Sequence, residues 1–155
     1  MSSVTAEMTG IGQFQARVQA GAHELLIDEP AELGGLGSGP NPYDLLCAAL
    51  AGCTLMTLEL YAKRKGWTLD PISVRVAHHK GTADKRDRFD RTLQLGKVTA
   101  EQRDALIKIA QRCPVDLLLE RGADVTVTVA DDGLAPAKPD WLHAQAVEEL
   151  CSEPD

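Results

Sequence analysis

The stretch that decides the fold is Gly-Pro-Asn-Pro-Tyr-Asp-Leu-Leu-Cys-Ala-Ala-Leu-Ala-Gly-Cys-Thr-Leu-Met-Thr-Leu-Glu-Leu-Tyr-Ala-Lys-Arg-Lys-Gly-Trp, residues 39–67. Apolar side chains recur in it at three- and four-residue spacing, which predicts a long helix with Cys53 on its apolar stripe. Asn41 is suited to cap the start of this helix because Pro42 fits the first helical position. Gly66 is suited to end it. We therefore expect a spine helix over residues 42–65.

A second cysteine, Cys113, directly precedes Pro114 in the segment Ala-Gln-Arg-Cys-Pro-Val-Asp, residues 110–116. Proline at the first helical position predicts that Cys113 is the N-cap of a short helix, where the helix dipole and the free backbone amides favour a thiolate. A single free cysteine is most often an inert core residue. Two cysteines in such distinct helical contexts indicate reversible redox chemistry.

The motifs around the two cysteines carry a resemblance to a known family. They are Gly-Ser-Gly-Pro-Asn-Pro-Tyr-Asp-Leu-Leu (37–46), the run 54–67 after Cys53, Arg-Phe-Asp-Arg (88–91) and Ile-Ala-Gln-Arg-Cys-Pro-Val (109–115). In this order, over about residues 14–130, the sequence resembles the OsmC/Ohr family. The arrangement of Asp28-Glu29-Pro30, Gly34-Gly35 and Gly39-Pro40 is most similar to the OsmC-like subgroup, rather than to the Ohr peroxidases proper.

The resemblance implies a fold and an assembly. The fold is the OsmC-like α+β fold, in which antiparallel sheets surround a long central helix. The assembly is an intertwined homodimer with two active sites that lie between the subunits. The spine helix is apolar on more than one side, which fits burial by a partner subunit as well as by its own sheet.

The resemblance also implies roles for individual residues. Cys53 corresponds to the peroxidatic thiol and Cys113 to the resolving thiol. The family holds the thiolate with an arginine of the N-terminal sheet, for which Arg17 on the expected early strand is the candidate. It also uses a glutamate near the start of the spine helix, but the matching position, ten residues before Cys53, is Tyr43. The nearest acid, Asp44, is therefore the candidate for that role.

The rest of the chain predicts strands and short helices. Alternating apolar residues predict a β-hairpin about Ala20-Gly21-Ala22, two more strands near residues 72–76 and 89–95, and a strand at Val125, Val127 and Val129 that closes the sheet. Thr99 and Gln102 form a capping box before a second helix. We expect one OsmC-like domain over residues 1–155, with its core at about 12–130. Residues 1–10 are expected to be flexible, the glycine-rich segment 30–42 to be a flexible loop, and residues 136–155 to form a helical extension capped by Asp140.

Composition limits the partners of the protein. The net charge of −7 argues against nucleic-acid binding, because phosphate contacts need a basic surface. We expect neither a membrane span nor a signal peptide, and therefore a cytoplasmic protein whose four cysteines rest as thiols. His78 and His79 are adjacent strand residues that point to opposite faces, and no closely spaced cysteine pair accompanies them, so we expect no metal site. The expected partners are a small organic hydroperoxide and an external dithiol reductant, with no bound cofactor.

Together these features predict a thiol-dependent peroxidase of the oxidative-stress type that reduces organic hydroperoxides. Cys53 attacks the peroxide oxygen, Arg17 and Asp44 hold the thiolate, and Cys113 forms the disulfide that the dithiol reduces. An alternative from another class is a small-molecule or acyl-binding module with little or no turnover, which Tyr43 in place of Glu favours. A third, hydrolysis or acyl transfer at Cys53, lacks a histidine and an acid placed as its base.

Overall fold

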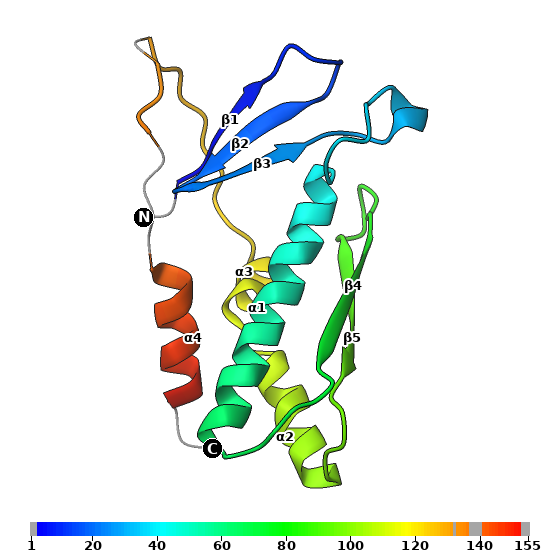
Figure 1. Cartoon of the computed structure of the whole chain (residues 1–155), viewed down its shortest axis with the longest axis vertical. Helices are drawn as coiled ribbons and strands as arrows, with labels where there is room; N and C mark the ends of the chain where they lie inside the picture. Colours follow the sequence, from blue (N-terminus) through cyan, green and yellow to red (C-terminus); the bar gives the residue numbers. More distant parts are fainter. Residues whose placement is uncertain (1–2, 132, 137–140, 153–155) are drawn as a thin grey trace. The chain divides into compact units, whose positions relative to one another are not determined.

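The computed structural model describes residues 3–131, 133–136 and 141–152 (Figure 1). The chain divides into two compact units, which we describe separately. The first unit comprises Met1–Leu45 and Asp124–Leu142, and the second comprises Leu46–Ala123 and His143–Asp155. The fold is of the α+β class with antiparallel sheets and a long helix, as the sequence predicts.

A three-stranded antiparallel sheet forms the first unit, in the order β1 (Thr5–Met8), β2 (Ala16–Ala20), β3 (His23–Ile27). The predicted hairpin is confirmed, because β2 and β3 pair along their whole length across a turn at Gly21, whose φ is 60°. Residues 1–10 are predicted to be flexible, whereas Thr5–Met8 pairs with β2 as strand β1. Ala6 and Met8 alternate with the polar residues Thr5 and Glu7, which is compatible with a strand, but the segment is short and its main-chain pairing with β2 is what identifies it.

The loop after β3 is anchored by one buried carboxylate. Asp28 accepts hydrogen bonds from the N–H groups of Glu29 at 2.9 Å, Leu36 at 3.0 Å and Ser38 at 3.2 Å, and from the Ser38 hydroxyl at 2.8 Å. Burial raises the pKa of Asp28, but these hydrogen bonds, foremost that of the Ser38 hydroxyl, outweigh burial and hold the pKa below its usual value. A 3₁₀ turn, η1 (Ala31–Leu33), lies within this loop. The loop predicted from its glycines thus has a fixed attachment point.

Residues 124–130 do not form the strand that the sequence predicts. Val125, Val127 and Val129 are between 88% and 91% exposed. No strand includes this segment in the part of the chain that the structure describes. A strand needs a partner edge for its hydrogen bonds, and the described residues of the chain supply none here. The prediction that these valines close the sheet is therefore wrong for the single chain.

The long helix α1 (Pro42–Arg64) forms as predicted. The Asn41 side-chain oxygen accepts hydrogen bonds from the N–H groups of Tyr43 at 2.9 Å and Asp44 at 3.0 Å. The Asp44 carboxylate accepts one in return from the Asn41 N–H at 3.1 Å. This reciprocal cap starts the helix, and Gly66, with a φ of 70°, follows its end.

By length and hydropathy alone, α1 is long and apolar enough to cross a membrane. This corrects the expectation that the chain holds no apolar run of that length. One side of α1, however, packs inside the protein, and its buried residues are Leu50, Cys53, Thr54, Thr57, Leu58, Tyr61 and Ala62. Because these residues contact other elements of the second unit, α1 is the core helix of a globular fold.

The remaining elements of the second unit are a hairpin and three helices. Strands β4 (Ser73–His79) and β5 (Arg88–Gln94) pair antiparallel over their full length. The helices are α2 (Ala100–Ala110), α3 (Pro114–Arg121) and α4 (Leu142–Ser152). The capping box of Thr99 and Gln102 and the N-cap position of Cys113 are confirmed. Asp140, which is expected to cap the last helix, lies outside the described residues.

The buried apolar residues of the second unit form two clusters. The larger gathers residues of α1, α2 and α4, among them Leu58, Leu106, Ile109 and Val147. The smaller consists of Leu50, Cys53 and Cys113, with Val76, Phe89, Val115 and Leu119 packed against it. The smaller cluster therefore joins α1, the β4–β5 hairpin and α3, and it contains both predicted redox cysteines.

Candidate functional site

Cys53 and Cys113 lie side by side, as the sequence predicts. Cys53 is 3% exposed and Cys113 is fully buried, and both belong to the smaller apolar cluster. A side-chain hydrogen bond joins the two thiols. Neither cysteine forms a disulfide in the structure. The fold thus holds two reduced thiols in direct contact, although they come from helices far apart in sequence.

The start of α3 places main-chain N–H groups beside both sulfurs. Pro114 is the first residue of the helix and Cys113 precedes it in an extended conformation. The Val115 N–H donates to Cys53 Sγ at 3.4 Å, and the Asp116 N–H donates to Cys113. Free N–H groups at a helix start carry partial positive charge, so this arrangement favours a negative sulfur.

The thiol pair carries its negative charge on Cys113. The hydrogen bond that Cys53 donates to Cys113 raises the pKa of Cys53 and lowers the pKa of Cys113 to about 6. Burial raises the pKa of both thiols, but for Cys113 it is outweighed by that hydrogen bond together with contacts from Thr54, the Asp116 N–H and the charge of Arg91. The two sulfurs therefore titrate as one pair that shares a proton near neutral pH.

Arg91 is the residue of this site that the sequence does not single out. It lies in β5 on the same, partly buried side as Phe89 and Leu93. Its Nη1 is 3.8 Å from Cys113 Sγ, 3.0 Å from the Thr54 hydroxyl oxygen and 2.7 Å from the Ala110 carbonyl oxygen. The signal that identifies it is an arginine on the same face of the strand as the apolar residues Phe89 and Leu93.

Asp116 completes the surroundings of the arginine. Its Oδ2 accepts a hydrogen bond from Arg91 Nη2 at 2.6 Å, and the side chains of Arg91 and Asp116 are only 15% and 13% exposed. The pair spans β5 and α3, while Arg91 also reaches α1 through Thr54 and α2 through Ala110. One guanidinium therefore connects the four elements that enclose Cys113.

The other two predicted site residues have partners of their own. Arg17, on β2, pairs through Nε with Glu24 on β3 at 3.3 Å, and both side chains are exposed. Asp44 lies in the first turn of α1 and caps Asn41. Asp44 precedes Cys53 by two and a half turns of the same helix, and at about 100° per residue this places the two on opposite sides of the helix axis. Their roles at the thiol stay predictions.

The two further cysteines and the histidine pair have local surroundings. Cys151 is buried in the larger cluster, where burial raises its pKa, and Cys47 on α1 is partly exposed. His78 Nε2 lies 2.7 Å from Asp87, and His79 Nε2 lies 3.0 Å from Asp90. Among the residues that the structure describes, no group of three or more side chains is placed to hold a metal ion.

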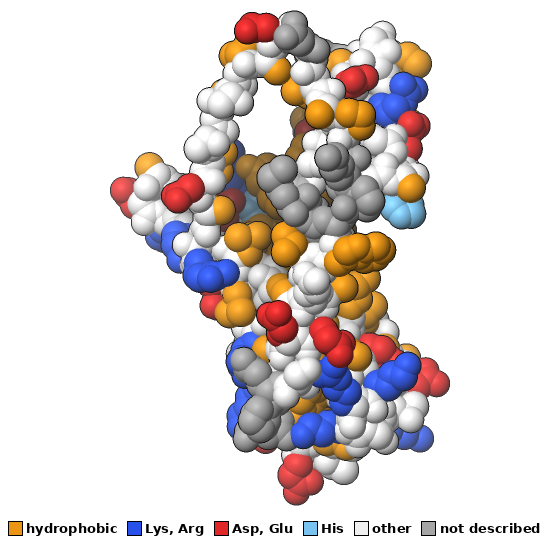
Figure 2. Space-filling model, turned by 90° about the vertical axis from the view of Figure 1, so that its left-hand side faces the viewer, with side chains coloured by type: hydrophobic (Ala, Val, Ile, Leu, Met, Phe, Trp, Pro, Cys, Tyr) orange, Lys and Arg blue, Asp and Glu red, His pale blue; other side chains and the backbone are white. Residues whose placement is uncertain are grey.

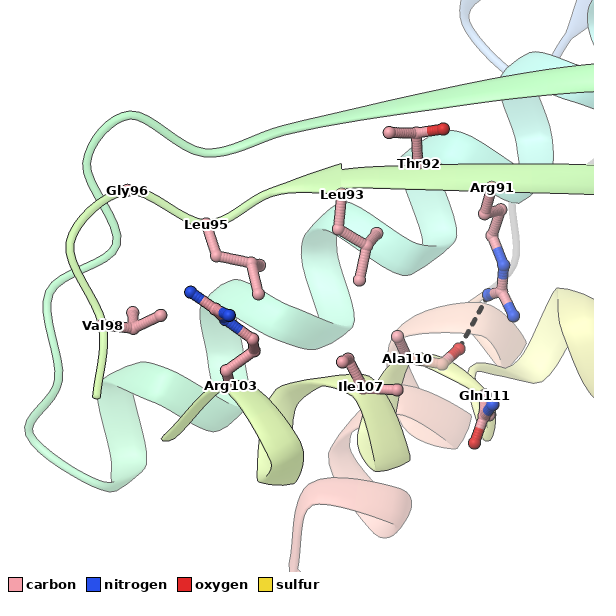
Figure 3. A pocket seen from close by; sticks show the side chains of 10 residues that line it. All are labelled: Arg91, Thr92, Leu93, Leu95, Gly96, Val98, Arg103, Ile107, Ala110 and Gln111. Carbon is pink, nitrogen blue, oxygen red and sulfur yellow. Dashed lines mark hydrogen bonds between the residues drawn. The ribbon is translucent and has the colours of Figure 1, made fainter. Parts of the chain in front are cut away.

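A cavity of about 560 Å³ lies between β5 and α2 and reaches Arg91 (Figure 3). Its walls include Leu93, Leu95 and Ile107, and Arg103 of α2 reaches into it. Arg91 and Ala110, which are both among the lining residues, are joined by a hydrogen bond from the guanidinium to the Ala110 carbonyl oxygen (Figure 3). Arg91 thus both contacts Cys113 and lines a partly apolar cavity.

Comparisons with known proteins agree with this fold. A family model described as OsmC-like protein matches residues 35–151, whereas no curated protein matches the sequence. The structure is similar to an OsmC-like protein from Mycoplasma pneumoniae, with a TM-score of 0.61 and 18% identity over 77% of this chain and 87% of that chain. It is also similar to the organic hydroperoxide resistance protein OsmC from Legionella pneumophila, with a TM-score of 0.56 and 22% identity over 77% and 88% of the two chains.

A third similar structure is the organic hydroperoxide resistance protein OhrB of Bacillus subtilis. Its TM-score is 0.54 and its identity 26%, over 76% of this chain and 88% of that chain. The family match extends from the loop before α1 to the end of the chain's last helix, and it includes both cysteines of the pair. On the strength of that match and the shared fold, the chain belongs to the OsmC-like protein family.

Proposed function

We propose that this protein is a cysteine-based oxidoreductase that reduces organic hydroperoxides through Cys53 and Cys113. The observation that carries the proposal is the direct contact of two almost fully buried thiols, next to the fixed positive charge of Arg91. The similar proteins from Legionella pneumophila and Bacillus subtilis are organic hydroperoxide resistance proteins. The family and this contact support the same chemistry.

The reaction needs two displacements, the first at an oxygen of the hydroperoxide and the second at the sulfur of Cys53. The Cys53 thiolate attacks the outer oxygen of the hydroperoxide, so that an S–O bond forms, the O–O bond breaks and the alkoxide takes a proton to become the alcohol. Cys53 is then a sulfenic acid. The Cys113 thiolate attacks this sulfur, the S–S bond forms, and the hydroxide that leaves is protonated to water. An external dithiol reduces the disulfide by thiol exchange.

The order of the two thiols follows from access and from proton sharing. Cys53 keeps a small exposed area whereas Cys113 has none, so a peroxide meets Cys53 first. The charge rests on Cys113 in the reduced pair, but the hydrogen bond between the thiols lets the proton pass to Cys113 and leaves Cys53 as the thiolate. The Val115 N–H stabilises the charge on Cys53 when it is there.

Arg17 and Asp44 are part of the proposal as the groups that hold the Cys53 thiolate, as the family resemblance implies. Arg17 pairs with Glu24, and Asp44 caps α1. In this proposal Arg17 leaves Glu24, and Asp44 leaves the α1 cap, to contact the Cys53 thiolate. Arg17→Gln and Asp44→Asn are therefore expected to lower the rate of Cys53 oxidation. A rate equal to that of the wild type would remove the residue concerned from the site.

The proposal includes a cytoplasmic homodimer. Hydrophobic side chains reach the surface on the face shown in Figure 2, and the first unit buries few apolar residues of its own while it exposes Val4, Met8, Ile11, Leu33, Leu36, Val125, Val127, Val129 and Leu134. A small sheet with so little buried apolar area needs a further covering surface to be stable. A second copy of the chain is the proposed cover, and an external dithiol is the proposed reductant.

A binding module with little turnover is the second candidate. Tyr43 stands where peroxidases of the family carry Glu, and the cavity beside Arg91 has apolar walls that suit the organic part of a ligand. In that case Cys53 is a packed thiol whose raised pKa keeps it unreactive toward mild peroxide.

The two candidates differ in what one equivalent of cumene hydroperoxide does to the reduced protein. The enzyme forms a Cys53–Cys113 disulfide, found by peptide mapping and reversed by dithiothreitol. Cys53→Ser abolishes peroxide consumption, while Cys113→Ser reacts once and accumulates sulfenic acid on Cys53, which further hydroperoxide oxidises to sulfinic acid. Cys47→Ser is the matched control, because Cys47 shares α1 with Cys53 but not its cluster. Turnover by Cys53→Ser near the wild-type rate, or both thiols still reduced, contradicts the peroxidase and leaves the binding module.

A further inference from the structure

The charged surroundings of Cys113 are more elaborate than those of Cys53. Arg91 contacts Cys113 from β5, and Thr54 on α1 places its Oγ1 3.5 Å from the Cys113 sulfur. The first turn of α3 supplies the Asp116 N–H. The titratable and charged groups that face Cys113 among the described residues are Cys53, Arg91 and Asp116. Apolar side chains of the smaller cluster fill the remaining space.

A guanidinium in this place is a permanent charge. Arginine keeps its proton throughout the range in which proteins are folded, and its planar fork satisfies several acceptors at fixed angles. Here Nη2 is taken by the Asp116 carboxylate, while Nη1 bonds Thr54 and the Ala110 carbonyl and remains 3.8 Å from Cys113 Sγ. Asp116 and Ala110 thus fix the guanidinium at the distance from which it attracts a charged sulfur.

We infer that Arg91 is a positioning residue for the second chemical step, in which it keeps Cys113 charged and aligned to attack the sulfenic acid on Cys53. The inference rests on the proposed function and assigns a residue to its disulfide-forming half. The charged sulfur attacks, the S–S bond forms, the S–O bond of the sulfenic acid breaks, and hydroxide leaves and is protonated. The hydroperoxide supplies the oxidising equivalents. Arg91 takes no part in bond making.

The first test needs no peroxide. The ultraviolet absorbance of the thiolate is followed against pH in reduced wild type, and the step that vanishes in Cys113→Ser is assigned to Cys113. In Arg91→Gln this step moves up by about one pH unit, because the loss of a nearby positive charge raises the pKa of an acid, and the charge of Arg91 lowers the pKa of Cys113 less than its hydrogen bonds do. In Asp116→Asn it moves down, because a negative neighbour is lost. If Arg91 and Asp116 only supported the packing around Cys113, the ionisation step of Cys113 would move in the same direction in Arg91→Gln and Asp116→Asn.

The second test measures the step itself. From a Cys113 pKa of about 6, a rise of about one unit lowers the charged fraction at neutral pH by about half. Disulfide formation after one equivalent of cumene hydroperoxide, read by rapid quench and mass spectrometry, therefore slows about twofold in Arg91→Gln, and sulfenic acid accumulates on Cys53. Formation of the sulfenic acid is followed in the same samples, so that any change in the first step, which draws on the proton shared by the two thiols, is measured separately from the second step. Arg91→Lys keeps the charge without the fork and gives an intermediate rate.

The control is Arg88→Gln, since Arg88 lies on the same strand but is exposed and pairs only with Asp90 at 3.0 Å among the contacts described. It is expected to match the wild type in both tests. An unmoved thiolate step in folded Arg91→Gln, or disulfide formation at the wild-type rate in that variant, overturns the role of Arg91 alone. If wild type forms no sulfenic acid with peroxide, the proposed function fails as well, and the thiolate titration distinguishes the two failures.

Discussion

The free energy of unfolding of the reduced protein is expected to rise between about pH 6 and pH 9, because Cys113 ionises in the folded state before it does so in the unfolded chain. Its pKa is about 6 in the fold against an ordinary value of 9.0. In this interval the unfolded chain binds one more proton than the folded protein, so stability increases with pH by at most about 1.4 kcal/mol per pH unit. The gain is lost as the pH falls through 6.

From about pH 6 to pH 8 the contribution amounts to about 2 kcal/mol. Above pH 9 the slope reverses, because Cys53 has a raised pKa and keeps its proton in the fold while the unfolded chain loses it. Urea unfolding with a dithiol present, at one protein concentration and several pH values, measures the rise. Other groups titrate in the same range, so the quantity that decides is the difference between wild type and Cys113→Ser.

Cys113→Ser should lose this part of the pH dependence, because a serine hydroxyl does not ionise in this range. Cys53→Ser should keep most of it, since the hydroxyl still donates a hydrogen bond to the Cys113 sulfur and the other contacts remain. An equal rise in wild type and Cys113→Ser would refute the assignment of the charge to Cys113. A rise lost in Cys53→Ser and kept in Cys113→Ser would place the charge on Cys53 instead.

Two further predictions concern packing and assembly. Leu58→Ala should lower the free energy of unfolding by about 2–5 kcal/mol in urea titrations, because Leu58 is fully buried between helices. The control is Met56→Ala on the exposed side of α1, which should change the free energy of unfolding little. Equal effects of the two substitutions would contradict the described core. Val127→Asp should shift the protein from dimer to monomer in sedimentation experiments if a second copy covers the exposed valines. The neighbouring Thr128→Asp is the control, and a dimer unaffected by Val127→Asp would exclude these valines from the interface.

The sequence predicted the features that depend on neighbours along the chain. Asn41 and Gly66 bound α1, Thr99 caps α2, and Cys113 precedes α3, because capping and turn conformations involve residues within one helical turn of each other. Periodicity placed Cys53 on the buried side of its helix. Strand β1 and the exposed segment 124–130 were not predicted, because strand formation depends on a partner edge that a local pattern does not reveal.

For this protein the sequence by itself determined the helices, the hairpins, the family and the two cysteines that we propose as its redox pair. Only the tertiary structure decided what surrounds those cysteines. Arg91, Asp116 and Thr54 meet Cys113 from three different elements. The energy of a charge beside a sulfur depends on distance and burial rather than on spacing along the chain. The acidity of Cys113 is therefore a property of the packed fold.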